Sequence, residues 1–155
     1  MHAGSPGVAS LVARLRSDSA GSQEQPRSQE LAAEELSRLM INNVDNQADL
    51  ARAGAIEPLV ALLHSGSAGA QEEAAATLGH LAHDNAENSV AIARAGAIKP
   101  LVALLRSSSA AAQEAAAAAL GHLAHDNAEN SVAIARAGAI EPLVALLHSG
   151  SAAAQ

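Results

Sequence analysis

The chain has 155 residues, of which 49% are hydrophobic, yet it contains no Phe, Trp, Tyr or Cys. Without cysteine, neither a disulfide framework nor a thiolate zinc site nor a cysteine nucleophile can be built. The formal net charge of −7 argues against nucleic acid as a partner, because phosphate binding needs a positive surface. No apolar stretch approaches the ~18 uninterrupted residues of a membrane span, so we expect no membrane association and a cytoplasmic location.

The N-terminal part of the chain differs from the rest. Residues 1–7 have neither the apolar core nor the length of a secretory signal, and we expect a flexible leader there. A diverged repeat is predicted at about 8–53, because Gln29–Ala33 aligns with Gln71–Ala75 at an offset of 42 residues. The extra residues of this copy fall around Gly21–Ser28, which we predict to be a polar loop.

A 42-residue repeat dominates the remainder of the chain. Residues 54–95 and 96–137 are identical at 36 of 42 positions, and a truncated copy occupies 138–155. A fixed period of this length predicts stacked units that bury a common core, and residues 8–155 are therefore predicted to form one repeat domain. Repeats this similar arise either from recent natural duplication or from a consensus-based, engineered design.

Each unit is predicted to contain three helices, of which the first is short. In the central copy this first helix is expected at about 85–95. Asp84 and Glu87 have the spacing of a capping box at its start. Gly96 is expected to end it, because glycine adopts the positive φ that a helix C-terminus often needs.

The second and third helices of the unit carry the stripes that should form the core. The second is expected at about 97–106, with Pro100 in its first turn, where a missing N–H costs little. The third is expected at about 110–125, with Ser109 as its N-cap. The predicted buried stripes are Ile98, Leu101, Val102 and Leu105 in the second helix, and Ala116, Ala119, Leu120 and Leu123 in the third.

Glycine also recurs inside the third helices, at Gly79 and Gly121. A glycine in a helix interior costs about 1 kcal/mol relative to alanine, so its recurrence predicts close packing between neighbouring helices. No helix of the unit can bury its stripe alone. The predicted fold class is therefore all-α, an α-solenoid of three-helix, 42-residue repeats.

The stretch Asn85–Leu105 resembles the armadillo repeat family. The 42-residue period, the three-helix division, the glycine after the first helix and the proline that follows are all similar to that family. The resemblance covers about residues 8–155 and is closest in style to the armadillo arrays of plants and algae. It implies a right-handed superhelix whose third helices line a concave groove for protein or peptide partners.

Importin-α-like members of that family bind the backbone of an extended peptide through groove asparagines, with a tryptophan four residues earlier. The resemblance places the asparagine position at Arg38, His80 and His122. It places the tryptophan position at Glu34, Ala76 and Ala118. Because neither residue type is kept, we do not expect the importin-α mode of binding, whereas the general role as a partner-binding surface is retained.

Histidines recur in pairs near the ends of the third helices. His80 and His83 are three residues apart and share a helix face, as do His122 and His125. Two ligands are too few for a tight zinc site, and we expect neither a metal nor a cofactor. Direct partner contact and pH sensing stay open as roles, because histidine titrates near neutrality. The predicted partner-binding face comprises Glu34, Arg38, Ala76, His80, His83, Ala118, His122 and His125.

No sequence motif points to catalysis. The chain has no nucleophile elbow, metalloprotease helix, phosphate loop or dinucleotide fingerprint, and we expect it not to be an enzyme. The glutamates that recur with the repeat are typical of solvated faces. An attractive groove for basic partners is the alternative reading of these charges.

The last second-helix segment carries the apolar stripe Ile140, Leu143, Val144 and Leu147. The sequence stops at Gln155, where the third helix of that unit would begin, so we expect this stripe to be exposed and to favour homo-oligomers, through head-to-tail or swapped contacts. The predicted function is a non-catalytic scaffold that binds proteins or peptides along its third helices. The alternative is an engineered or excised array that folds and self-associates without a dedicated ligand.

Overall fold

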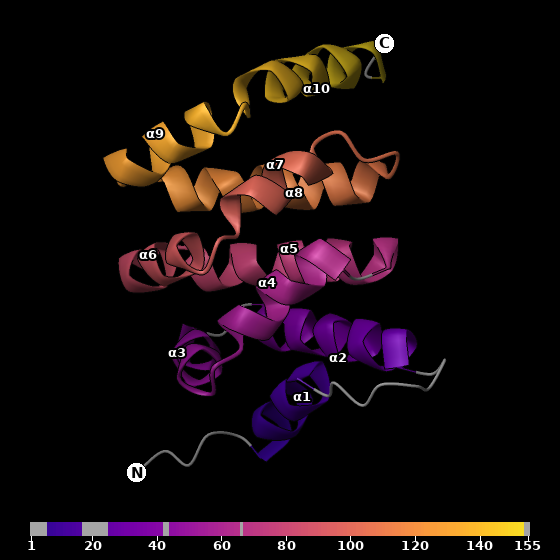
Figure 1. Ribbon diagram of the computed structural model, residues 1–155, viewed down its shortest axis with the longest axis vertical. Helices are drawn as coiled ribbons and strands as arrows, with labels where there is room; N and C mark the ends of the chain where they lie inside the picture. The colour runs from indigo at the N-terminus through magenta and orange to yellow at the C-terminus, as the bar shows by residue number, and fades with distance from the viewer. Residues whose placement is uncertain (1–5, 17–24, 42–43, 66, 154–155) are drawn as a thin grey trace.

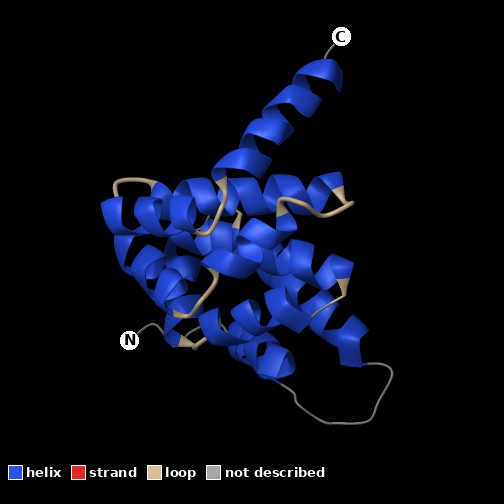
Figure 2. Ribbon diagram, turned by 45° about the horizontal axis from the view of Figure 1, so that its top comes forward, coloured by secondary structure: helices blue, strands red, loops and turns tan. Residues whose placement is uncertain are grey.

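A computed structural model describes residues 6–16, 25–41, 44–65 and 67–153, and its regular structure there is entirely helical (Figure 2). In chain order the helices are α1 (Pro6–Arg16), α2 (Gln25–Met40), α3 (Val44–Arg52), α4 (Ile56–Ser65), α5 (Ala68–Ala82), α6 (Ala86–Arg94), α7 (Ile98–Leu104), α8 (Ala110–Ala124), α9 (Ala128–Arg136) and α10 (Ile140–Ala153). The all-α prediction is confirmed.

The helices stack as repeated triplets, as Figure 1 shows. The long third helices α2, α5 and α8 lie side by side, and α5 packs against both of its neighbours. The second helices α1, α4 and α7 each pack against the third helix that follows them in the chain. The predicted α-solenoid of three-helix units is therefore confirmed, with α3–α5 and α6–α8 as its two complete triplets.

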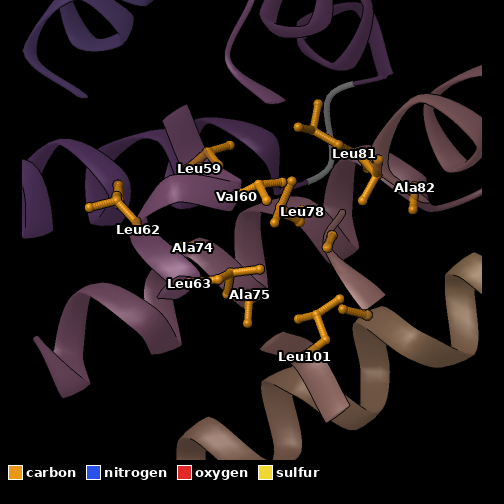
Figure 3. Packing of buried hydrophobic residues seen from close by; sticks show 14 of the residues in the cluster. Leu59, Val60, Leu62, Leu63, Ala74, Ala75, Leu78, Leu81, Ala82 and Leu101 are labelled. Atoms are coloured by element: carbon orange, nitrogen blue, oxygen red, sulfur yellow. The ribbon is translucent and has the colours of Figure 1, made fainter. Parts of the chain in front are cut away.

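The core lies between the second and third helices of each unit. In Figure 3 the buried leucines and valine of α4 meet the alanines and leucines of α5, and Leu101 of α7 approaches from the next unit. Burying one such leucine contributes about 1.5–3 kcal/mol. The predicted stripes of α7 and α8, from Ile98 to Leu105 and from Ala116 to Leu123, are buried.

Glycines and capping serines end and begin the helices as predicted. Gly54, Gly96 and Gly138 have φ of +77°, +89° and +88°, so each takes the left-handed conformation that reverses the chain between a first and a second helix. Ser109 is the N-cap of α8, since its hydroxyl oxygen accepts a hydrogen bond from the Ala112 amide at 3.2 Å.

The predicted capping box at Asp84 is wrong. Asp84 has φ +51°, a left-handed conformation that turns the chain between α5 and α6, and an N-cap residue cannot adopt it. The cap is Asn85, whose backbone is extended and whose side-chain oxygen accepts from the Asn88 amide at 3.0 Å. The same shift of one residue occurs at Asp126 and Asn127.

Two predicted boundaries near the N-terminus also move. The polar loop was expected to reach Ser28, but α2 begins at Gln25, because the proline at 26 fits the first turn of a helix. Helix α1 begins at Pro6, inside the predicted leader. Residues 1–5 and 17–24 lie outside the described residues, so the remainder of the leader and loop predictions is untested.

The two mid-helix glycines have different surroundings. A Cβ added at Gly79 would lie 3.3 Å from the Ala119 Cα and 3.4 Å from its Cβ, so the predicted close packing of α5 against α8 is confirmed there. A Cβ added at Gly121 would meet no described atom within 4 Å. The prediction is therefore wrong for Gly121, because no other third helix of the described chain packs against that face of α8.

Helix α10 runs unbroken to Ala153, through the point where a third helix was expected to start, and it projects from the stack (Figure 2). Ile140, Val144 and Leu147 are 63%, 45% and 74% exposed, whereas Leu143 packs partly against the core. The exposed apolar stripe is thus observed. Among the described residues no single helix is long and apolar enough to span a membrane. Taken together, Ala128–Arg136 and Ile140–Ser149 have the length and the composition of a membrane span, but the two helices are bent by 82° relative to each other.

Candidate functional site

A groove of about 320 Å³ lies between the third helices α5 and α8. No residue of α4 or α7 lines it, so it opens on the face of the third helices that the second helices leave uncovered. Its lining consists of Glu72, Ala76, Gly79, His80, Ala111, Glu114, Ala115, Ala118 and His122. Half of the predicted partner-binding residues, namely Ala76, His80, Ala118 and His122, are thus brought together on one surface.

The lining repeats with the sequence. On α5 the groove residues Glu72, Ala76 and His80 follow one another at intervals of four residues, which places them on one helix face. On α8 the same three residue types recur 42 positions later, at Glu114, Ala118 and His122. Each helix therefore presents a carboxylate, a methyl group and an imidazole in the same order.

Glu72 and Glu114 were absent from the predicted site. The glutamates that recur with the repeat are predicted to lie on solvated faces, with an attractive groove for basic partners as the alternative. The four-residue spacing from the predicted alanines would have identified them, since residues at i and i+4 are neighbours on a helix.

The predicted residues of α2 lie on the preceding third helix. Glu34 and Arg38 form an ion pair through Glu34 Oε1 and Arg38 Nη2, and Arg38 is exposed. They occupy the repeat positions of Ala76 and His80. The α2 surface therefore offers a charge pair where α5 and α8 offer alanine and histidine, and it does not line the α5–α8 groove.

Carboxylates gather along the α2 and α5 helices. Burial raises the pKa of Glu73, and the nearby charges of Glu34 and Glu72 raise that pKa further, while Arg38 opposes the shift. The Ser67 hydroxyl donates to Glu30 Oε2 at 2.9 Å, next to the start of α5. Three carboxylates and one arginine therefore surround Glu73, and the charge around it is predominantly negative.

The opposite end of the groove is formed by histidines. The ring of His83, the C-cap residue that follows α5, meets the ring of His122 on α8 edge to face, with 4.7 Å between centroids and an interplanar angle of 86°. Burial lowers the pKa of His80, and His83 lowers that pKa further. The pKa of His122 is lowered by burial first, then by His83 and His80, against an opposing effect of Asp84.

The other two histidines of the predicted site lie at helix ends, half exposed and close to acidic side chains. His83 Nδ1 lies 3.6 Å from Asp84 Oδ2, and His125 Nε2 lies 3.4 Å from Asp126 Oδ2. A second cleft of about 260 Å³ includes His122, His125 and both of these aspartates. No group of three or more His, Asp or Glu side chains that could hold a metal ion occurs in the described ranges.

Buried amides fix the histidine end of the third helices. Asn88 Nδ2 donates to the Leu81 carbonyl at 2.9 Å, and Asn130 Nδ2 repeats this bond to the Leu123 carbonyl at 2.9 Å. Gln47 Nε2 of α3 donates to the His80 carbonyl at 2.7 Å. These bonds satisfy carbonyl groups that the end of an α-helix leaves without partners. Sequence reasoning missed these asparagines, although they recur 42 residues apart.

A larger hollow, of about 930 Å³, lies elsewhere, between α6 and α7 on one side and α9 on the other. It contains none of the predicted partner-binding residues. Val132 and Ile98 contribute to its predominantly apolar wall, and Lys99, Glu129 and Arg136 to its polar part.

Comparison with known structures finds designed proteins. A designed armadillo repeat protein, YIII(Dq)4CqI, is 32% identical over 92% of this chain, with a TM-score of 0.80. A second, solved in complex with peptide (KR)4, is 31% identical over 90% of this chain, with a TM-score of 0.76. Computationally designed armadillo repeat proteins for modular peptide recognition are 32% identical over 90% of this chain, with a TM-score of 0.78. The chain spans 56–57% of the length of these proteins.

Comparison with curated protein sequences finds no match. Comparison with protein families matches residues 43–83 and 85–125 to the armadillo/β-catenin-like repeat. These two matches cover more than half of the chain and coincide with the triplets α3–α5 and α6–α8. The chain therefore belongs to the armadillo/β-catenin-like repeat family.

Proposed function

We propose that the chain is a non-catalytic scaffold that binds an extended, cationic peptide or protein segment in the groove between α5 and α8. The observation that carries the proposal is the repeated row of carboxylate, methyl and imidazole groups on the two helices, with Glu72 and Glu114 at one edge. Such an edge attracts Lys and Arg side chains, and the repeat gives the two binding positions the same chemistry. The (KR)4 peptide in the complex of a similar designed protein supports a cationic partner.

The alanine floor of the groove sets the expected affinity. Ala76 and Ala118 supply little side-chain area, so the groove is shallow and lacks the aromatic anchors that dominate tight interfaces. Exposed ion pairs contribute about 0.2–1 kcal/mol each and weaken with salt. We therefore expect modest affinity that decreases as salt is added.

The test is a calorimetric titration of the peptide (KR)4 into wild-type protein and the double variant Glu72→Gln/Glu114→Gln. Loss of two ion pairs is expected to weaken binding by about tenfold. The control is Glu87→Gln/Glu129→Gln, which removes the same two charges from the exposed first turns of α6 and α9. Equal weakening in both variants would mean that net charge, and not the groove, attracts the peptide.

A second candidate function is self-association. Among the described residues, the large apolar side chains that are exposed fall within 31–41 or 132–147, and none lies in the central helices α3–α8. The stripe formed by Ile140, Val144 and Leu147 contains the two most exposed of these side chains, and it offers a surface to a second copy of the chain.

Sedimentation velocity over a concentration series tests this candidate. We expect the wild-type chain to associate and Leu147→Glu to reduce association, because a carboxylate on the stripe would have to be buried. An exchange at an exposed site off the stripe, Ala145→Glu, is the control. A wild-type chain that stays monomeric at millimolar concentration would reject self-association.

A further inference from the structure

We propose that the histidines of the α5–α8 junction form a pH-controlled release element: in mild acid they become positively charged and expel the cationic segment from the groove. The inference rests on the proposed function and adds its regulation. It starts from the contact of His83 with His122, which joins two successive repeats.

The ring contact depends on the protonation state. An edge-to-face pair of neutral rings is attractive, because the positive edge of one ring points at the electron-rich face of the other. When both rings are protonated, two like charges stand 4.7 Å apart, one on the exposed His83 and one on the partly buried His122. His80 lines the groove beside His122, so the repulsion involves three imidazoles from two helices.

Few charges oppose this repulsion. Asp84, from the turn between α5 and α6, is the carboxylate close to His83 and His122. His125 of α8 adds to the positive side, and its own neighbour is Asp126. Helix α3 contributes the uncharged amide of Gln47, which binds the carbonyl oxygens of His80 and His83. Four histidines of this cluster thus face two aspartates, Asp84 and Asp126.

The same change reverses the charge of the groove. At neutral pH its titratable lining is Glu72 and Glu114 with neutral His80 and His122, which favours a cation. In acid the two histidines carry positive charge into the groove. Lys and Arg side chains of the bound segment stay charged throughout this range, so the change comes from the groove.

The experiment measures the affinity for (KR)4 at pH 7.5, 6.5 and 5.5 with wild-type protein and the triple variant His80→Gln/His83→Gln/His122→Gln. We expect the wild-type affinity to fall about tenfold or more toward pH 5.5, because like charges replace neutral rings beside the ligand. The triple variant should bind with an affinity that changes less than about twofold. The variant keeps every groove glutamate, so any titration of those carboxylates affects both proteins equally.

A control variant, His64→Gln/His148→Gln, removes two histidines that do not line the groove and should keep the wild-type pH response. If the triple variant fails to fold, the double variant His80→Gln/His122→Gln replaces it; it removes the two histidines that line the groove and should lose most of the response. Equal affinity of the wild-type protein at pH 7.5 and 5.5 would overturn the release element and leave peptide binding in place. No binding by any variant at pH 7.5 would instead reject the proposed function, and the release element with it.

Discussion

The α2–α5 and α5–α8 junctions are made from the same repeat positions but are held together differently. The units that contain α5 and α8 differ at six positions, and three of these, 69/111, 73/115 and 77/119, face the preceding third helix. A Cβ at Gly69 would collide with Glu30 of α2. The Thr77 hydroxyl lies 2.8 Å from the Glu73 carbonyl of its own helix and 3.3 Å from the Ala33 carbonyl of α2, and its single proton is shared between these two acceptors.

At the α5–α8 junction the corresponding residues are alanines, and Ala119 packs against Gly79 without side-chain polar groups. Three of the six differences between the two repeats therefore lie where α5 contacts α2 and where α8 contacts α5. They follow the difference between the contacted helices, α2 and α5. The comparison teaches that these positions adapt each third helix to the one it packs against, while the shared positions build the common core.

Enlarging the glycine of the α5–α8 junction should have the largest effect. Gly79→Leu is expected to destabilise the protein by about 2–3 kcal/mol, because the added side chain meets the backbone of Ala119 and forces the helices apart. Gly121→Leu, at the same repeat position but with open space around it, should instead stabilise by roughly 0.5–1 kcal/mol through helix propensity. Urea unfolding of the two variants measures both effects. Equal destabilisation by Gly79→Leu and Gly121→Leu would show that the contact of Gly79 with Ala119 is not the cause.

Removing the hydroxyl that joins α2 to α5 should have a smaller effect. Thr77→Val keeps the shape of the side chain but loses the hydroxyl proton shared by the Glu73 and Ala33 carbonyls, at a cost of about 1 kcal/mol. Ala119→Val, at the same position of α8, is the companion variant and tests packing without a hydroxyl. If Thr77→Val unfolds at the same temperature as the wild-type protein, this hydroxyl does not stabilise the junction.

Acid should weaken the histidine side of the α5–α8 junction. The pKa values of His80 and His122 are lowered in the folded protein, so the unfolded chain binds protons more tightly than the folded chain does. The resulting contribution to stability is complete above about pH 6.5 and is lost as the pH falls through the lowered pKa values.

Because both rings are partly exposed, solvent screening keeps this loss below about 1 kcal/mol. Urea midpoints at pH 7.5 and 5.5 measure it. The triple variant without His80, His83 and His122 should show a smaller decrease than the wild-type protein, and an identical decrease would assign the pH effect to other groups.

The smallest effect is expected at Glu73, on the acidic side of the α2–α5 junction. Its pKa is raised, so the stability of the folded state falls as the pH rises through that pKa. Glu73→Ala, which introduces the residue found at position 115, should therefore stabilise the protein at pH 7 by roughly 0.5 kcal/mol after screening. The gain should shrink toward pH 4, where the carboxyl group of the wild-type protein becomes protonated in both states. Destabilisation at pH 7 would contradict the assigned role of this glutamate.

The repeat made most of the fold predictable, because a 42-residue period with apolar stripes leaves a stack of helices as the way to bury them. Errors arose where a residue type permits two roles. Asp84 has the spacing of a capping residue, but Asp also tolerates the left-handed conformation that the turn requires. Gly121 has the same sequence surroundings as Gly79, and only the arrangement of the stack tells which of them faces another helix.

The candidate site was predictable in part. The resemblance to the armadillo family placed Ala76, His80, Ala118 and His122 on the binding face of the third helices, and they line one groove. The contact between His83 and His122 depends on the lateral offset of two packed helices, which the spacing within each repeat does not determine. Glu72 and Glu114 lie four residues before Ala76 and Ala118, and this spacing predicts that they line the same groove. Glutamate is so common on exposed helix surfaces that its presence alone does not indicate a binding site.

The most direct test of the account is a ¹H–¹⁵N NMR titration of the labelled protein with (KR)4 at pH 7.5. The account predicts that the amide shifts concentrate along α5 and α8, around Glu72, Ala76, Glu114 and Ala118, and that they are weak in Glu72→Gln/Glu114→Gln. Shifts centred on α9 and α10, or a spectrum that the peptide leaves unchanged, would contradict the claim that the third-helix groove is the binding surface.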